Sequence, residues 1–328
     1  MNMMKNLFNI PFRTLGLVAN AHLDPAGIVV IQRTVKFLQS PQSRSSKKSP
    51  PYKLLFNKHA LTALGPQKRE RVSINKGFDI IETPYPPPST LATLMARCDL
   101  ILTFGGDGTL IKLARHTTEK PVPVLSINLG HIGFLTEIQN PRDVLPMLKK
   151  VLAGNYQLDT RSLLRLSVYR HGKKVETHLA LNEAVINQGN FARLIELSAE
   201  MNQRRMVQFK ADGVIIATPT GSTAHSLSAG GPIVHPKLQA IIFTPICPST
   251  LSMRPIVLPS DRQITLNIHT ERRFKDNQIA LTLDGQVVTP LEYGDQIKIR
   301  LSQREFHLVR LQNTRYYQML REKLNWGS

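Results

Sequence analysis

Short apolar runs alternate with amphipathic segments over the first 154 residues of the chain. Apolar side chains dominate residues 15–19, 100–104 and 122–127, which have the length and composition of buried strands. Residues 26–38 carry apolar side chains at helical spacing instead. Strands that alternate with helices in this way are typical of βαβ units. The pattern therefore predicts an open α/β sheet in the first part of the chain.

Helix boundary signals follow the last of these strands. Asn140 suits an N-cap, Pro141 suits the first helical position, and Gly154 supplies a stop. The segment between them has an apolar stripe, made of Val144, Leu145, Leu148, Val151 and Leu152. A second helix is predicted at the end of the chain, over residues 315–326.

Beyond Tyr156 the pattern changes to short strands with turn residues between them. The predicted strands are residues 166–170, 179–186, 194–201, 213–218, 240–244, 263–269, 278–283 and 296–301. This spacing is typical of an antiparallel β-sandwich. The predicted fold is thus a Rossmann-like α/β domain (residues 1–135), a β-sandwich domain (residues 136–304) and a terminal segment (residues 305–328) that packs back on the first domain.

Composition places the chain among globular proteins, since 41% of its 328 residues are hydrophobic. No apolar run approaches the roughly 18 residues that a membrane span requires. Cys98 and Cys247 match neither a disulfide framework nor a zinc spacing, and the histidines have no ligand-like spacing either. We therefore expect a cytoplasmic protein without membrane association, and we assign no metal-ligating side chains.

The chain is strongly basic, with a formal net charge of +19. Such charge suits nucleic acid, an anionic membrane surface or a polyanionic small molecule such as ATP. Much of the excess lies in residues 40–76, which are rich in Pro, Ser, Lys and Arg. We interpret that stretch as a solvated, partly flexible insertion, and we do not expect a nucleic-acid-binding arm.

The segment with the clearest chemistry is a glycine-rich turn after the strand at residues 100–104. The turn consists of Gly105, Gly106, Asp107 and Gly108, followed by Thr109 and a helix predicted over residues 109–116. Glycines let backbone amides approach phosphate oxygens, and a helix N-terminus favours an anion. The plainer interpretation is a tight turn with Asp107 as N-cap, but capping does not require three glycines. The turn therefore predicts a phosphate-binding site, at the sheet edge where α/β proteins bind ligands.

This turn is neither a Walker loop nor a dinucleotide fingerprint, because the lysine and the glycine spacing of those motifs are missing. It resembles the Gly-Gly-Asp-Gly-Thr motif of NAD kinases, diacylglycerol and sphingosine kinases and, more remotely, phosphofructokinases. That resemblance alone implies ATP-dependent phosphorylation of a hydroxyl group.

Motifs in the second half distinguish among these kinases. Residues 210–233 resemble the second signature of NAD kinases, and Leu181-Asn182-Glu183-Ala184 resembles their Asn-Glu motif. Residues 128–136 and 284–286 are supporting matches. The chain therefore resembles bacterial NAD kinases from about Thr14 to its end. The resemblance implies transfer of a phosphoryl group from ATP to the adenosine-ribose 2′-hydroxyl of NAD.

The resemblance also implies roles for individual residues. Asp107 falls on the position of the catalytic base, beside Gly108 in the substrate pocket, and Asn182 and Glu183 fall where the family holds ribose hydroxyls and adenine. The remaining expected substrate contacts are Arg193, Lys210, Asp212, Thr223, Ala224, His225, Ser226, Leu227, Ser228 and Gln286. Gln286 follows Asp284-Gly285, which is first of all a hairpin turn.

Further expectations follow from the same resemblance: ATP with a divalent metal ion, Mg²⁺, and a homo-oligomer, dimer or tetramer, whose site a neighbouring subunit completes. The chain departs from the family at His225, where Tyr is common, and at Lys210, where a bacterial subgroup often has Arg. The second departure leaves both NAD and NADH open as acceptors. The alternatives to an NAD kinase are a lipid kinase of the diacylglycerol type and a catalytically idle dinucleotide- or nucleic-acid-binding regulator.

Overall fold

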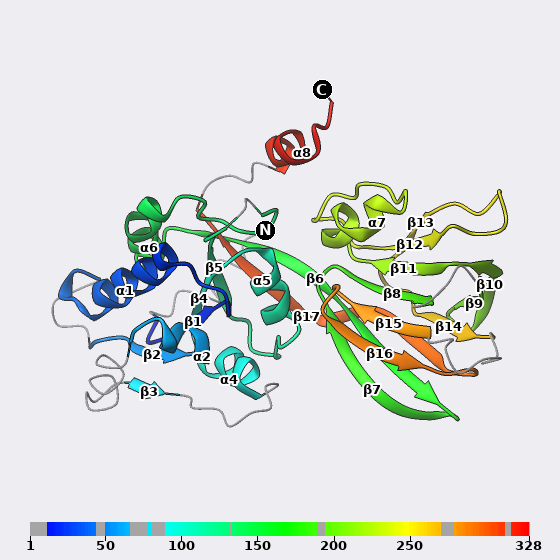
Figure 1. Cartoon of the computed structure of the whole chain (residues 1–328), viewed down its shortest axis with the longest axis horizontal. Coiled ribbons are helices and arrows are strands. Elements are labelled where there is room, and N and C mark those ends of the chain that lie inside the picture. Colours follow the sequence, from blue (N-terminus) through cyan, green and yellow to red (C-terminus); the bar gives the residue numbers. More distant parts are fainter. Residues whose placement is uncertain are drawn as a thin grey trace. The chain divides into compact units, whose positions relative to one another are not determined.

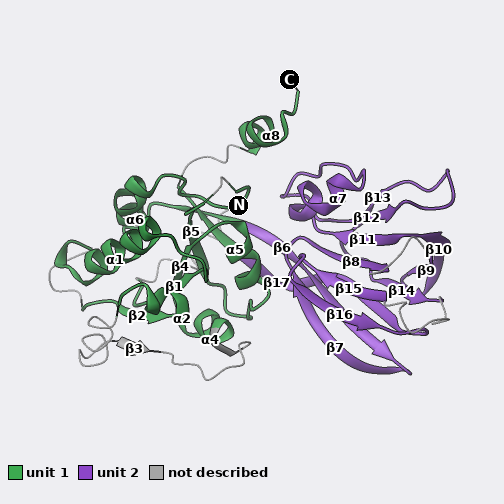
Figure 2. Cartoon of the chain, viewed as in Figure 1, with its two compact units in different colours: residues 1–159, 307–328 green, residues 160–306 purple. Residues whose placement is uncertain are grey.

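The computed structural model describes residues 12–43, 50–65, 78–80, 89–130, 133–188, 194–269, 279–311 and 316–327. The chain forms two compact units, coloured separately in Figure 2. Unit 1 comprises residues 1–159 and 307–328, and unit 2 comprises residues 160–306. Strands β6 (Gln157–Arg170) and β17 (Gln296–Arg310) each have residues in both units.

Unit 1 contains a parallel sheet with the strand order β3-β2-β1-β4-β5-β17. Its other strands are β1 (Thr14–Ala19), β2 (Lys53–Phe56), β3 (Phe78–Ile80), β4 (Leu100–Phe104) and β5 (Pro123–Ile127). β4 and β5 are buried along their whole length, as expected for parallel strands with helices on both faces. β17 joins the sheet through His307 and Leu308, which pair with β5.

Unit 1 also contains helices. They are α1 (Pro25–Gln39), η2 (Pro41–Ser43), α2 (Lys58–Thr62), α4 (Ser89–Arg97), α5 (Asp107–Ala114), η3 (Pro141–Asp143), α6 (Val144–Leu152) and α8 (Tyr316–Leu324). Of these, α1, α2, α5 and α6 lie beside this sheet in Figure 1. Apolar residues of α1 and α6 share one core cluster with alternate residues of β1, β2, β4 and β5. Asn140 caps the turn before α6, because its side chain accepts a hydrogen bond from the Arg142 amide at 3.0 Å. The predictions of the Asn140 cap and of an amphipathic helix after it are therefore confirmed.

Part of the predicted basic insertion is regular structure. Within residues 40–76, β2 is fully paired with β1, and Leu54, Leu55 and Phe56 are at most 1% exposed. Asn57 then caps α2 and also bonds the Ala19 backbone through its amide oxygen and nitrogen, at 3.0 and 2.9 Å. The interpretation of one solvated insertion is wrong for this part, because three apolar residues between lysines are enough for a buried strand. Residues 44–49 and 66–77 lie outside the described residues.

Unit 2 is built from antiparallel strands in two layers. Its strands, besides β6 and β17, are β7 (Lys173–Ala180), β8 (Glu183–Gln188), β9 (Ile195–Met201), β10 (Arg204–Ala211), β11 (Gly213–Ala217), β12 (Ala240–Ile246), β13 (Ile256–Pro259), β14 (Ile264–Ile268), β15 (Ile279–Leu283) and β16 (Val287–Leu291). One layer has the strand order β13-β12-β11-β8-β15-β16. The other layer has the order β10-β9-β14-β17, and β6 extends it by pairing with β17 and with β7.

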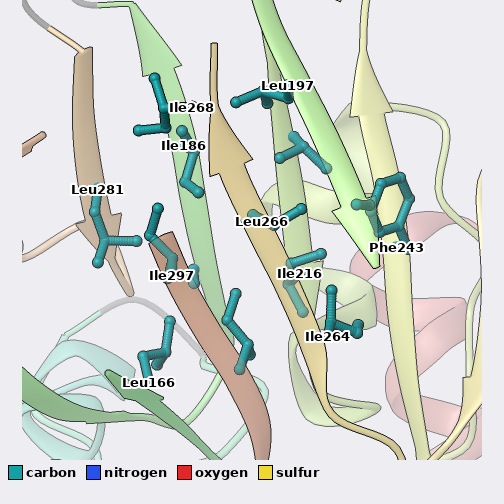
Figure 3. Packing of buried hydrophobic residues seen from close by; sticks show 14 of the residues in the cluster. Leu166, Ile186, Leu197, Ile216, Phe243, Ile264, Leu266, Ile268, Leu281 and Ile297 are labelled. Atoms are coloured by element: carbon teal, nitrogen blue, oxygen red, sulfur yellow. The ribbon is translucent and has the colours of Figure 1, made fainter. Parts of the chain in front are cut away.

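A single hydrophobic core joins the two layers of unit 2. Figure 3 shows Ile186, Ile216 and Phe243 of one layer close to Leu197 and Leu266 of the other. Side chains from both layers interdigitate in this way in a β-sandwich. The predicted fold class, an open α/β sheet with a glycine-rich turn followed by an antiparallel β-sandwich, is confirmed.

The predicted strand at residues 179–186 is wrong in one respect, because the structure has two strands there. β7 ends at Ala180 and β8 begins at Glu183. Between them, the backbone of Leu181 and Asn182 bonds to Asp284 and Thr218 instead of a neighbouring strand. Contacts with residues distant in sequence therefore interrupt the strand at residues 181–182. This interruption lies at the centre of the site described next.

Candidate functional site

The glycine-rich turn of unit 1 joins the end of β4 to the start of α5. Gly105 has φ of 151°, and a side chain there would collide with the Thr109 hydroxyl. Gly106 is the N-cap of α5, so no side chain caps this helix. The alternative with Asp107 as N-cap is therefore wrong, and the helix begins two residues earlier than the predicted residue 109. A helix N-terminus after such a turn is a suitable binding site for phosphate.

The Asp107 side chain contacts the connector that follows β5. Its two carboxylate oxygens accept hydrogen bonds from the backbone amides of Phe134, at 2.7 Å, and Leu135, at 3.0 Å. Gly133 lies directly against this carboxylate, because a Cβ there would be 2.6 Å from Asp107 Cγ. Asp107 is only partly buried. Since each carboxylate oxygen can accept two hydrogen bonds, Asp107 keeps acceptor capacity for a substrate.

In unit 2 the Asn182–Glu183 pair is held by another aspartate. The buried carboxylate of Asp284 accepts hydrogen bonds from the backbone amides of Leu181, Asn182 and Glu183, at 3.0, 2.8 and 3.1 Å. Asp284 and Gly285 have φ of 50° and 64° and form the turn between β15 and β16. Sequence reasoning treated this pair as a hairpin turn and as part of a supporting motif match, and it missed this second role, for which an Asp-Gly pair gives no separate signal. The contact brings the turn that carries Gln286 beside the Asn-Glu motif.

Glu183 has an unusual environment. It is 5% exposed, and its Oε2 atom has no hydrogen-bond partner among the described residues. Burial, and secondly the negative charge of Asp284, raises the pKa of Glu183 to about 8. A carboxylic acid that stays protonated at neutral pH can donate a hydrogen bond to a ligand oxygen or nitrogen.

The loop after β11 packs on the same motif. Thr218 donates from its hydroxyl to the Leu181 carbonyl at 2.6 Å and from its amide to the Asn182 carbonyl at 2.8 Å. A Cβ on Gly221 would lie 2.7 Å from the Asn182 Cα atom, so only glycine fits there. The loop continues as η4 (Thr220–Thr223) and α7 (His225–Ser228). The structure therefore brings this loop, the Asn-Glu motif and the Asp284 turn together.

Side chains of the predicted loop residues differ in exposure. His225 and Ser228 are exposed, and Thr223, Ala224 and Leu227 are partly buried. Ser226 is buried, and its hydroxyl is 3.0 Å from the Thr244 hydroxyl, so that side chain stabilises the loop.

One buried residue beside this loop was missed by sequence reasoning. Arg161 of β6 is 5% exposed and donates to the Thr220 hydroxyl at 3.3 Å. Its neighbours Asp159, Thr160 and Ser162 are polar, so the local sequence gives no signal that this arginine is buried.

Lys210 and Asp212 lie at the opposite end of β11 from this site. Gly213 at the start of β11 pairs with Asn187, whereas Ala217 at its end pairs with Glu183. Four residues of strand separate these ends by about 13 Å. Lys210 is exposed and its ammonium is 3.7 Å from the Glu196 carboxylate. Within one chain the structure does not bring Lys210 and Asp212 to the Asn-Glu motif, and Arg193 lies outside the described residues.

Together these features define a class of protein: a nucleotide-binding transferase with a glycine-rich phosphate turn in an α/β unit and a polar ligand site in a β-sandwich unit. Residues 31–156 match the family model of the ATP-NAD kinase N-terminal domain, and residues 181–311 match that of the ATP-NAD kinase C-terminal domain.

Relatives agree with these family matches. The chain is 46% identical to an NAD kinase of Geotalea daltonii over 231 residues, which cover 70% of this chain and 80% of the relative. It is 46% identical to an NAD kinase of Geobacter sulfurreducens over 229 residues, 70% of this chain and 79% of the relative. In fold it is similar to yeast NADH kinase, solved in complex with NADH, with a TM-score of 0.81 at 24% identity over 98% of this chain and 89% of that one.

The chain belongs to the ATP-NAD kinase family. It is therefore a kinase that transfers a phosphoryl group from ATP to NAD and forms NADP, as its sequence motifs predicted. The match extends over both units, which decides against a lipid kinase of the diacylglycerol type.

Proposed function

We propose that the acceptor is the adenosine-ribose 2′-hydroxyl of NAD and that Asp107 orients this hydroxyl and accepts its proton. The observation that carries the proposal is the geometry of Asp107. Asp107 is the first residue of the helix that follows the glycine-rich turn, its carboxylate is fixed by the backbone amides of Phe134 and Leu135, and it is only partly buried. A positioned acceptor beside a phosphate-binding turn is what in-line phosphoryl transfer requires.

In this mechanism the chain's own residues mainly bind and orient the reactants. Backbone amides of the turn and the N-terminus of α5 bind phosphate oxygens of ATP. The proton leaves the hydroxyl late in a loose transition state, so a carboxylate is a sufficient base. Positioning and charge stabilisation supply most of the rate enhancement.

Unit 2 supplies the proposed NAD-binding groups. Asn182 offers an amide donor and acceptor to ribose hydroxyls, and protonated Glu183 offers a donor to a buried ligand atom. Thr223, Ala224, His225, Ser226, Leu227 and Ser228 form the segment that we assign to the adenine end. We assign Gln286 as a further contact, because it follows the Asp284 turn that bonds Asn182 and Glu183. The hydrogen bonds from Asp284 and Thr218 to residues 181–183 support this assignment, because they fix the backbone that presents Asn182 and Glu183.

We also propose Mg²⁺ as a cofactor. Within the described ranges, no group of three or more His, Cys, Asp or Glu side chains is placed to hold a metal ion. The backbone amides of the glycine-rich turn can bind phosphate oxygens, and Asp107 is the one carboxylate in the turn, which fits a metal ion that would be held mainly by the phosphates of ATP. Such a metal ion would neutralise the charge that develops during transfer.

The proposed acceptor and base are tested together by measuring NADP formation. Asp107→Asn keeps the shape of the side chain, so a folded variant should retain NAD binding while kcat falls by about 100-fold or more. An NAD analogue with 2′-deoxyadenosine should bind to the wild-type enzyme without accepting phosphate. Normal turnover by Asp107→Asn, or phosphorylation of the deoxy analogue, would contradict the respective assignment. NADH in place of NAD in the same assay decides which acceptor this chain prefers.

We propose in addition that the enzyme is a homo-oligomer, a dimer or tetramer, in which a second copy supplies Lys210 and Asp212. Two observations support this. Both residues lie at the far end of β11 from Glu183 within one chain. The edge strand β13 leaves Ile256 and Val257 exposed, and nearby Leu251 is 87% exposed, which suits burial against another copy.

A complementation experiment tests the shared site. Asp107→Asn and Lys210→Glu should each be weakly active alone. Unfolded and refolded together, they should recover activity approaching about a quarter of wild type, because random assortment in a dimer restores one site in four. No recovery in mixed oligomers would contradict a shared site, and a fully active monomer by light scattering would contradict the oligomer.

We assign the enzyme to the cytoplasm. Both cysteines are free, Cys98 buried and Cys247 exposed, which suits a reducing compartment. No helix in the described part of the chain has the length and hydrophobicity to cross a membrane. Fractionation of the native host tests the assignment, and recovery with membranes or outside the cell would contradict it.

A further inference from the structure

A buried ionic cluster lies directly behind the connector that binds Asp107. Its centre is Arg310, at the end of β17, whose side chain is 6% exposed. Arg310 Nε donates to Asp159 at 3.0 Å, and Arg310 Nη1 donates to Glu137 at 3.1 Å. The Asp159 and Glu137 side chains are 10% and 14% exposed. One arginine thus joins three chain segments through two shielded carboxylates.

The cluster is linked to Asp107 through a single residue, Leu135. The Leu135 amide donates to Asp107 Oδ1 at 3.0 Å, and the Leu135 carbonyl accepts from Arg310 Nη1 at 3.0 Å. The connector therefore lies between Asp107 on one side and Arg310 on the other. A shift of Leu135 lengthens at least one of these two bonds.

Glu137 strengthens the same anchoring. Its second carboxylate oxygen accepts from the Leu311 amide at 2.8 Å, and its own amide donates to the Ser126 hydroxyl at 2.8 Å. Ser126 lies on β5, which pairs with β4, the strand that leads into the glycine-rich turn. Arg310 and Glu137 thus fix the connector to the same sheet that positions the turn.

We propose that Arg310, supported by Glu137, is a positioning residue for phosphoryl transfer. It fixes the Leu135 peptide and thereby the amides that orient the Asp107 carboxylate. This inference rests on the proposed role of Asp107 as acceptor. The planar guanidinium suits the task, because its donors point in fixed directions and it stays charged. A displacement of about 1 Å at a reacting group is enough to lower a rate by about 100-fold.

The test compares Arg310→Gln with Arg310→Lys. Arg310→Gln should lower kcat by about 10-fold or more while KM for NAD changes by less than about 3-fold, because positioning affects the transition state more than substrate binding. Arg310→Lys keeps the positive charge but has one donor nitrogen in place of the planar fork, so it should recover part of kcat. If Arg310→Gln does not fold, Glu137→Gln removes the charge with little change of shape and should lower kcat in the same way.

A double variant separates positioning from general stability. If Arg310 acts through Asp107, adding Arg310→Gln to Asp107→Asn should lower kcat by no more than about 2-fold further. If Arg310→Gln lowered kcat by about 10-fold in the Asp107→Asn variant as well, the proposal would be overturned. A fully active Asp107→Asn single variant would overturn the role of Asp107 itself, and the proposal with it.

Arg170 provides a matched control within unit 2. It forms a more exposed arginine–carboxylate cluster, with Asp295 at 2.8 Å and Glu292 at 2.9 Å, and among the described residues it makes no hydrogen bond to the Asp107 connector or to the Asn-Glu motif. Arg170→Gln should lower the unfolding temperature and leave kcat within about 2-fold of wild type. An equal loss of kcat in the Arg170 and Arg310 variants would indicate a general effect of stability and overturn the proposal.

Discussion

Two aspartates, one in each unit, make the same kind of hydrogen bond to backbone amides but have different roles. Asp107 and Asp284 both stand beside glycines in turns, and both accept hydrogen bonds from backbone amides of a segment distant in sequence. Asp107 receives two such bonds and is partly exposed, whereas Asp284 receives three and is 7% exposed. A carboxylate has about four acceptor positions. Asp284 is therefore mostly occupied in fixing the protein's own backbone, while Asp107 retains capacity for a substrate.

The largest expected difference is between the two Asn variants. Asp107→Asn should lower kcat by about 100-fold or more with little loss of stability, because only one of two amides loses its acceptor. Asp284→Asn should instead lower the free energy of unfolding by about 2 kcal/mol, since buried amides lose a charged acceptor. Urea unfolding and steady-state kinetics on both variants check this. Equal effects of the two variants on kcat would contradict the division of roles.

Local sequence signals predicted one aspartate's environment better than the other's. The strand before Asp107 and its glycine-rich turn are local patterns, so their prediction was accurate, apart from the helix start. The Asp284 contacts are not local: Asp284 lies 103 residues after Leu181, and no pattern near either residue indicates that they meet. For the same reason the break between β7 and β8 was not predicted.

Exposed strands were also missed. β7 and β10 carry mostly exposed or half-buried residues and lack the strict apolar alternation by which strands are recognised. The motif at residues 210–233 groups Lys210 with the loop around Thr223, yet the fold places them at opposite ends of β11. Sequence order identified the family, but it did not indicate which motif residues meet within one chain.

The second prediction uses the charge of Asp284 to probe Glu183. The folded pKa of Glu183, about 8, lies above its ordinary value of 4.5. The folded state therefore holds a proton that the unfolded chain releases, so the stability from Glu183 is complete below about pH 4.5 and is lost as pH rises towards 8. Relative to Glu183→Gln, wild type should lose about 3 to 4 kcal/mol of stability between pH 5 and pH 8, measured by urea unfolding.

The same measurement in Asp284→Asn sharpens the comparison. Removing the neighbouring charge should lower the pKa of Glu183 and shorten the pH range over which stability falls, but burial, the larger cause, should keep part of the effect. Identical pH profiles for wild type and Glu183→Gln would show that Glu183 is not held in a protonated, buried state.

The smallest expected effect comes from the glycine beside Asp284. Gly285 has φ of 64°, but a Cβ there would meet no atom within 4 Å. Gly285→Ala should therefore cost only the backbone strain, about 1 kcal/mol of unfolding free energy, and leave kcat unchanged.

The matched change beside Asp107 is Gly133→Ala, whose Cβ would lie against the Asp107 carboxylate. That variant should lower kcat by about 10-fold, because the carboxylate must move. If Gly285→Ala lowered kcat as much as Gly133→Ala, both aspartates would orient substrate, and the assignment of Asp284 to the backbone alone would be wrong.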